Sequence, residues 1–128
     1  MNRTLVKKID KVFSLYIRKR DSKNGVSICC SCGVRKPYEY FDAGHFINRR
    51  FMATRWREDN CHAQCRSCNR FSEGDAAGYA LFMLDKYGKK QVEYLRALRQ
   101  QTAKFTDTEG ELMLADLKQK IKDLPNQA

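Results

Sequence analysis

The chain has 128 residues, of which 42% are hydrophobic, and this length and composition favour one domain with a modest core. Charges throughout residues 1–20 exclude a secretory signal, and no apolar stretch could span a bilayer, so we expect a soluble cytoplasmic protein. The net charge of +10 lies in residues 1–70, where 16 Lys and Arg face 6 Asp and Glu, because residues 71–128 carry nine of each.

The first predicted element is an amphipathic helix over residues 4–20, because apolar residues recur there at helical spacing between lysines and arginines. The apolar positions are Leu5, Ile9, Val12, Phe13, Tyr16 and Ile17. A polar break over residues 21–25 follows the helix and ends this N-terminal segment.

The middle of the chain is predicted to contain short strands and two cysteine-bearing turns. The first turn lies within residues 26–40, and residues 41–51 form a short extended or looping segment. A second strand is expected over residues 61–64, and the second cysteine-bearing turn, over residues 65–69, leads into a helix.

Residues 78–128 are predicted to form a helical cap over a core of residues 26–77, all within one domain. Gly88 is expected to end the first helix of the cap, and Thr106 or Asp107 to cap the last. Three apolar stripes carry this prediction: Tyr79, Leu81, Phe82, Leu84 and Tyr87; Val92, Leu95 and Leu98; and Leu112, Leu117, Ile121 and Leu124.

Four of the six cysteines form two CxxC pairs, Cys29 with Cys32 and Cys65 with Cys68. Metal binding is favoured over disulfides because the cytosol keeps thiols reduced. One tight turn aims two thiolates at one ion, and two such turns complete the tetrahedral shell that structural zinc prefers. The spacing therefore predicts a structural Zn²⁺ site.

Cys30 and Cys61 are left over, and we interpret both as buried cysteines that pack as small apolar residues. Cys30 could replace Cys29 as a ligand, but only one residue would then separate it from Cys32, which is a poorer fit. A redox role is disfavoured because the two pairs match each other and no βαβ pattern surrounds them.

All basic residues between positions 45 and 70 are arginines: Arg49, Arg50, Arg55, Arg57, Arg66 and Arg70. Arginine binds phosphate oxygens in a bidentate manner, so this run favours nucleic-acid binding over a basic face kept for solubility. Aromatic residues are interleaved with these arginines, and most of them are expected in the core. Trp56 is the best candidate for an anchor, either on DNA or in packing.

The two histidines of the chain, His45 and His62, both lie between the CxxC pairs. Together with Asn60 and with Asn69, which directly follows Cys68, their order resembles that of the His-Asn-His (ββα-metal) nucleases. This resemblance implies that His45 is the general base and that Asn60 holds the His45 ring through a side-chain hydrogen bond. It further implies that Asn69 is a ligand of a catalytic Mg²⁺ or Mn²⁺ ion.

Residues 13–21, 42–45 and 62–69 together resemble the NinG/Rap family of recombination endonucleases from lambdoid phages and prophages, over roughly residues 4–80. Residues 65–74 also share a local likeness with a phage junction resolvase. The resemblance implies cleavage of branched DNA joints, within a bacterial host cell.

One position departs from the superfamily pattern, because Gly44 stands where many His-Asn-His enzymes have a metal-binding residue before the general base. Asp42 could replace that ligand through a bulge in the strand, or be a turn residue. His62 could also reach the ion, or else contact one of the ligands of the ion, or contact DNA. Glu73 is a weaker candidate and is more often a solvated helix residue.

We therefore expect an α+β fold: a zinc-braced ββα-metal nuclease core with a basic N-terminal helix and C-terminal helices. The expected function is metal-dependent DNA endonuclease activity on branched recombination intermediates. The alternatives are a less specialised nicking or double-strand endonuclease of restriction or packaging, and a noncatalytic zinc module that binds DNA. A homodimer is a further hypothesis, because the neutral C-terminal third carries apolar stripes, and recombination proteins are candidate partners.

Overall fold

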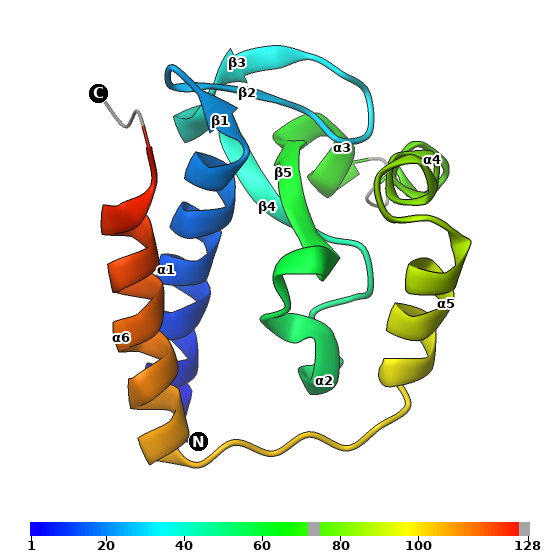
Figure 1. The fold of residues 1–128 in the computed structure, drawn as a ribbon. Coiled ribbons are helices and arrows are strands. Elements are labelled where there is room, and N and C mark those ends of the chain that lie inside the picture. The colour runs from blue at the N-terminus through cyan, green and yellow to red at the C-terminus, as the bar shows by residue number, and fades with distance from the viewer. Residues whose placement is uncertain (72–74, 126–128) are drawn as a thin grey trace.

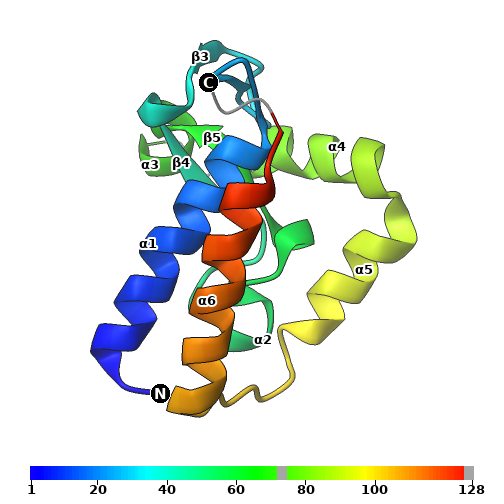
Figure 2. The same ribbon diagram turned by 60° about the vertical axis from the view of Figure 1, so that its left-hand side comes forward.

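The computed structural model describes residues 1–71 and 75–125, and in it two long helices lie side by side along one edge of the molecule (Figures 1 and 2). These are α1 (Arg3–Arg20) and α6 (Asp107–Asp123). Asn2 caps α1. Thr106, one of the two candidates that the sequence offered, caps α6 and forms a capping box with Glu109.

The contact between α1 and α6 forms the first hydrophobic cluster, which includes Ile9 and Phe13 of α1 and Leu114 and Leu117 of α6. A Cβ atom at Gly110 would come within 2.8 Å of the Leu5 side chain, so the glycine lets the helices approach closely. The predicted stripe was wrong at Leu112, which is 67% exposed. The buried row is 110, 114 and 117, because these positions lie on the face of α6 turned toward α1.

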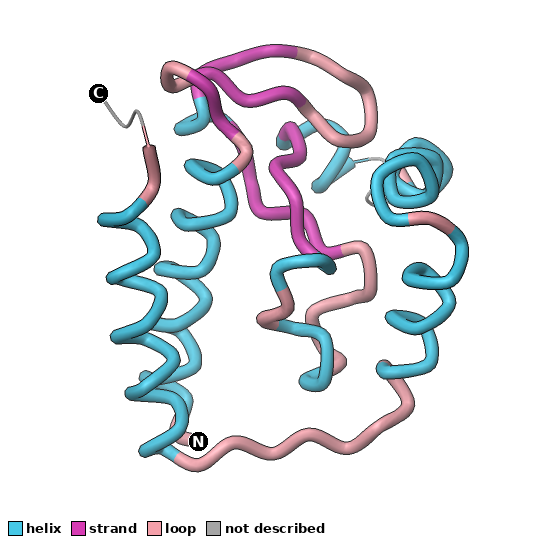
Figure 3. The backbone as a smooth tube through the Cα atoms, in the orientation of Figure 1, coloured by secondary structure: helices cyan, strands magenta, loops and turns pink. Residues whose placement is uncertain are grey.

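The centre of the molecule is an antiparallel hairpin of β4 (Phe41–His45) and β5 (Cys61–Cys65), followed directly by α3 (Arg66–Phe71) (Figure 3). The register runs from Phe41 opposite Cys65 to His45 opposite Cys61 without interruption. Side chains alternate across the hairpin, so His45, Ala43 and Cys61 share one face, and Gly44 and His62 share the other. The first face packs against the α1 cluster.

Short elements connect this hairpin to the rest of the chain. A three-stranded antiparallel sheet of β1 (Ser22–Lys23), β2 (Val26–Ile28) and β3 (Arg35–Pro37) precedes it. The 3-10 turns η1 (Tyr38–Tyr40) and η2 (Glu58–Asn60) and the short helix α2 (Met52–Arg55) flank its strands.

Helices α4 (Ala76–Tyr87) and α5 (Lys89–Leu98) form the second cluster, on the other side of the hairpin (Figure 1). Gly88 separates them, and Val92, Leu95 and Leu98 are buried, as the sequence predicted. The predicted stripe of α4 was wrong at Leu81 and Leu84, which are exposed. Tyr79 and Met83, four residues apart, form the buried row instead.

The fold is α+β, built from helices and small sheets. Within residues 1–71 and 75–125, none of the helices combines the length and the apolar character that crossing a membrane requires.

Candidate functional site

Four cysteine side chains meet where the loop after β2 contacts the end of β5 and the start of α3. The Sγ atoms of Cys29, Cys32, Cys65 and Cys68 all lie within 4.8 Å of one another. The Sγ atoms of Cys32 and Cys65 are 3.8 Å apart. Two sulfur atoms bound to the same tetrahedral zinc are also about 3.8 Å apart, because each Zn–S bond is about 2.3 Å long. These four residues could therefore hold a structural metal such as zinc.

Backbone N–H groups prepare this cluster for a cation. Cys29 Sγ accepts hydrogen bonds from the N–H groups of Cys65 (3.3 Å) and Cys32 (3.5 Å), and Cys65 Sγ accepts one from Cys68 (3.5 Å). Burial raises the pKa of Cys29, but these donors outweigh it and lower the pKa to about 7. A thiolate is the form that a metal binds, so at Cys29 the backbone favours metal binding. The pKa of Cys68 is raised by burial and by hydrogen bonds to the neighbouring cysteines. A backbone hydrogen bond to Val34 lowers the pKa of Cys32, but burial and hydrogen bonds to the neighbouring cysteines outweigh it and raise the pKa.

Cys30 and Cys61 lie outside the group of four. Cys61 is buried in the hairpin against α1, and burial raises the pKa of its thiol well above the ordinary value. Cys30 is half-buried, and burial raises the pKa of its thiol to about 12. Cys61 is thus the buried, neutral, apolar thiol that the sequence suggested, whereas Cys30 is neutral but only partly buried.

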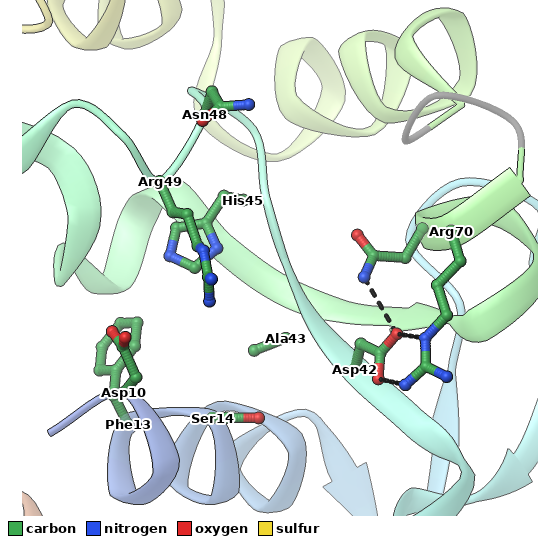
Figure 4. Close-up of a pocket in the computed structure, with 10 residues that line it drawn as sticks. Asp10, Phe13, Ser14, Asp42, Ala43, His45, Asn48, Arg49 and Arg70 are labelled. Carbon is green, nitrogen blue, oxygen red and sulfur yellow. Dashed lines mark hydrogen bonds and ion pairs between the residues drawn. The ribbon is translucent and has the colours of Figure 1, made fainter. Parts of the chain in front are cut away.

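A polar cavity of about 730 Å³ lies between α1, β4 and α3, and we call it the hairpin pocket. It brings together Asp42, His45 and Asn69, three residues that the sequence pattern singled out. Figure 4 shows Asp42 and His45 in this pocket. Its full lining is Asp10, Phe13, Ser14, Asp42, Ala43, His45, Asn48, Arg49, Asn69 and Arg70.

His45 stands at one side of the hairpin pocket with its ring held by the backbone. Its Nε2 atom lies 2.9 Å from the carbonyl oxygen of Arg55. Because a carbonyl can only accept, Nε2 carries the proton and Nδ1 presents its lone pair. Burial lowers the pKa of His45, although the Arg55 carbonyl and the charge of Asp10 act in the opposite direction. The ring is therefore neutral near pH 7 and able to accept a proton at Nδ1.

Asp42 stands at the other side of the pocket, where it meets two side chains of α3 (Figure 4). Its carboxylate accepts hydrogen bonds from Asn69 Nδ2 (3.0 Å) and from Arg70 Nε and Nη2 (2.9 Å each). Burial raises the pKa of Asp42, but the hydrogen bonds of Arg70 and Asn69 outweigh it and lower the pKa. The register of β4 is continuous, so β4 has no bulge of the kind that the sequence suggested. By alternation Asp42 belongs to the face of Gly44 and not to that of His45, although both Asp42 and His45 line the pocket.

This pair fits a hard divalent cation. A carboxylate and an amide carbonyl are oxygen ligands of the kind that Mg²⁺ and Mn²⁺ take. The Asn69 amide nitrogen now faces Asp42, and a rotation of the amide would turn its oxygen to the same point. A bound cation would take the place of the Arg70 guanidinium, which contacts the same carboxylate.

Gly44 leaves no room for the ligand that many His-Asn-His enzymes carry before the base. A Cβ atom at this position would meet the Gln64 side-chain oxygen at 2.2 Å. The carbonyl of Gly44 also accepts a hydrogen bond from the Tyr79 hydroxyl at 2.7 Å. The strand is therefore packed tightly at this point on the face opposite to His45.

The expected hydrogen bond between Asn60 and the His45 ring was wrong. Asn60 is fully buried, and its side chain bonds the backbone of the loop that follows β4. Its Oδ1 accepts from Ile47 N–H (2.8 Å), and its Nδ2 donates to the carbonyls of Ile47 and Thr54 (3.1 Å each). Asn60 thus fixes the loop, whereas the Arg55 carbonyl holds the ring.

The expectation that His62 could reach the catalytic ion was also wrong. His62 is buried on the hairpin face opposite to His45, and it does not line the hairpin pocket. Its Nδ1 lies 3.1 Å from the Tyr79 hydroxyl, and its Nε2 lies 2.7 Å from the Tyr87 hydroxyl. Both ring nitrogens are therefore engaged, and burial lowers the pKa of His62 to about 4. Glu73, the other candidate, lies outside the described residues.

The six arginines of the predicted DNA-binding run divide into two groups. Arg49 and Arg50 are exposed beside the pocket, and Arg66 and Arg70 are exposed on α3 near Asp42. Arg55 and Arg57 are less exposed and form ion pairs with Asp10 (2.5 Å) and Asp59 (2.9 Å), whereas Arg66 and Arg70 pair with Asp42. Arg55 and Arg57 thus stabilise the fold, and their contact with DNA stays a prediction.

Asp10 is a site residue that the sequence reasoning missed. Its carboxylate accepts from Arg55 Nε (3.0 Å), Arg55 Nη2 (2.5 Å) and Trp56 Nε1 (2.9 Å). It thereby anchors the residue whose carbonyl holds His45, and it makes Trp56 an anchor of packing. One signal was available: Asp10 is the only acidic residue in the basic helix α1.

The comparisons with known proteins agree with the resemblance noted in the sequence. The model of a family described as Bacteriophage Lambda NinG protein matches residues 1–127. Neither the curated proteins nor the solved structures contain a match to the chain.

Proposed function

We propose that this chain, which belongs to the bacteriophage lambda NinG family, is a metal-dependent DNA endonuclease that acts on branched recombination intermediates. Membership of the family suggests a phage protein related to recombination. The nuclease activity and the preference for branched DNA are the steps that we add.

The observation that carries the proposal is the meeting of Asp42, His45 and Asn69 in one pocket. A general base with a free lone pair and two oxygen ligands on facing elements are what metal-assisted phosphodiester hydrolysis requires. The order of β4, β5 and α3 supports the assignment to the ββα-metal superfamily, because base and ligand come from the first strand and from the helix.

In the proposed reaction, His45 Nδ1 takes a proton from the attacking water. The Arg55 carbonyl then stabilises the imidazolium through the Nε2–H group. The oxygen of that water bonds to phosphorus, the bond from phosphorus to one deoxyribose oxygen breaks, and solvent protonates the leaving oxygen. Asp42 and Asn69 are the residues that would hold a Mg²⁺ or Mn²⁺ ion, which would neutralise the negative charge that develops on the phosphate.

Two further groups support the site. Arg49 and Arg70, which line the pocket and reach solvent, are placed to bind the flanking phosphates. A structural metal on the four cysteines would tie Cys68 of α3 to the loop after β2. Asn69 and Arg70 follow Cys68 directly, so the metal would also fix their position.

A cleavage assay on supercoiled plasmid, linear duplex, flap and four-way junction DNA tests the proposal. With Mg²⁺ or Mn²⁺, the wild-type chain should cut the junction preferentially. His45→Gln should not cut it, because glutamine can still donate to the Arg55 carbonyl but cannot act as the base. Intact substrates with the wild-type chain would leave a noncatalytic zinc module that binds DNA. Equal cutting of linear and branched DNA would indicate a less specialised endonuclease.

The oligomeric state is a separate proposal. A resolvase that cuts opposite strands benefits from two active sites, and the exposed Leu81 and Leu84 of α4 offer an apolar surface for a second copy or a recombination protein. Sedimentation of the chain with and without junction DNA decides the point, and a monomer under both conditions would exclude the homodimer.

A further inference from the structure

A second cavity, of about 570 Å³, lies between the loop that follows β4 and the end of α5, and we call it the loop pocket. It is lined by Phe46, Ile47, Asn48, Arg50, Phe51, Arg99 and Gln100. Asn48 lines the hairpin pocket as well, where Figure 4 draws it above His45. The two cavities are therefore neighbours along the chain segment that leaves the general base.

The loop pocket combines aromatic faces with positive charge. Phe46 and Phe51 are only partly buried, and the Arg50 guanidinium lies 4.7 Å from the centre of the Phe51 ring. Arg50 and Arg99 are exposed at its edge, and none of the described residues that line it is acidic. An aromatic ring beside guanidinium groups is suited to stack a nucleobase and to bind its phosphate.

The walls of the loop pocket are held in place before any ligand binds. The buried Asn60 side chain bonds both backbone groups of Ile47, and the Asn48 side chain accepts from Arg50 N–H at 2.9 Å. The Phe46 ring packs against Tyr79, with ring centres 5.5 Å apart. The volume lies within the range of about 300–1,000 Å³ that small-molecule sites occupy, which is large enough for a single nucleotide.

We infer that the loop pocket binds one unpaired nucleotide of the DNA strand whose phosphodiester lies in the hairpin pocket. The base stacks on Phe51, and its phosphate contacts Arg99. This inference rests on the proposed function, because it assumes that the hairpin pocket holds DNA. It also supplies a physical reason for a preference for branched DNA, since branch points offer unpaired nucleotides and an intact duplex does not.

The test is a binding experiment without added Mg²⁺ or Mn²⁺, so that binding is separated from cleavage. Fluorescence anisotropy measures the affinity for a duplex with one unpaired thymidine, and for the same duplex with an abasic residue at that position. We expect the wild-type chain to bind the thymidine form about 10-fold more tightly, which is within the range for stacking on one aromatic ring. Phe51→Leu keeps an apolar side chain and should lose most of this difference.

A second variant keeps the test decisive if Phe51→Leu folds poorly. Arg99→Gln should weaken binding of both DNAs and should reduce the slope of log affinity against log salt by about 0.9, the effect of one lost phosphate contact. The matched control is Arg96→Gln, an exposed arginine of the same helix that does not line the pocket and should leave the slope unchanged.

The outcomes separate this inference from the proposed function. Equal wild-type affinity for the thymidine and abasic forms would overturn the inference, even if the chain cuts DNA. Full retention of the difference in a folded Phe51→Leu variant would overturn it too. If the chain cuts no DNA but the difference is present and lost in Phe51→Leu, the loop pocket stands and the nuclease proposal fails.

Discussion

Replacing Asp10 by asparagine should disturb the position and the pKa of His45, although His45 itself is unchanged. Asp10 accepts three hydrogen bonds, two from Arg55 and one from Trp56, and both side chains of the ion pair are largely buried, with 23% and 14% exposure. Asp10→Asn keeps the shape of the side chain but presents an N–H group to the Arg55 guanidinium. Because hydrogen bonds to charged groups contribute ~1.5–3 kcal/mol and solvent screens part of this pair, we expect a loss of about 2 kcal/mol in the free energy of unfolding.

Asp10→Asn should also lower the activity. The Arg55 carbonyl holds the His45 ring, and a displaced base costs about 10- to 100-fold in kcat/KM. The Asp10 charge also raises the pKa of His45, so its removal lowers that pKa further. His45 must be neutral to accept a proton, and the acid limb of the pH–rate profile should therefore move to lower pH.

A pH–rate profile of junction cleavage, with unfolding in urea as the companion measurement, tests this reasoning. The matched control is Asp59→Asn, which breaks a similar ion pair with Arg57 two residues further along the chain. The control should lose stability and keep the acid limb in place. Asp10 does not control the pKa of His45 if the acid limb of Asp10→Asn coincides with that of the wild type, or if Asp59→Asn moves the acid limb equally.

Three further predictions concern stability and metal content. Cys65→Ser should lose bound zinc and much of its folded structure, whereas Cys30→Ser should keep both; stoichiometric zinc by mass spectrometry in Cys65→Ser would contradict the ligand assignment. Asn60→Ala should lower the free energy of unfolding by about 2–4 kcal/mol, because it leaves three buried backbone groups without their partner, and a urea titration with a loss under 1 kcal/mol would speak against that role. The pKa of His62 is lowered to about 4 in the folded chain, so the unfolded chain binds more protons between about pH 6.5 and 4. Stability should fall by up to about 3 kcal/mol as pH drops through that window, and it should fall less in His62→Gln; identical pH curves would exclude His62 as the cause.

Local patterns in the sequence predicted the features that depend on neighbouring residues. The CxxC spacing placed Cys29, Cys32, Cys65 and Cys68 in one cluster, because two tight turns can aim four thiolates at one point. Thr106 and Gly88 were predicted for the same reason, because both act locally. Thr106 accepts a hydrogen bond from a free N–H group at the start of α6, and Gly88 ends α4. Asp42, His45 and Asn69, which the sequence singled out, line one pocket, and their roles stay a prediction.

Contacts between distant segments could not be read from spacing. Helical periodicity alone allowed several faces of α4 and α6 to be the buried one. Packing against neighbouring elements buries Met83 and Leu114, and it leaves Leu81 and Leu112 exposed. The position of His62 between two cysteine pairs also did not indicate on which face of the hairpin its side chain lies. The alternation of side chains along β5 places His62 on the face opposite to His45.

Spacing and composition are local properties, and they predicted the four-cysteine cluster, the basic first half and the residue types of the proposed hydrolytic site. The contacts that support that site depend on the tertiary structure. Asp10 and Arg55 are 45 residues apart, and only the packing of α1 against the hairpin brings the Asp10 carboxylate to the Arg55 guanidinium. The backbone carbonyl of the same Arg55 holds the His45 ring. Hydrogen bonds act over about 3 Å, so such a role exists only once the chain has folded.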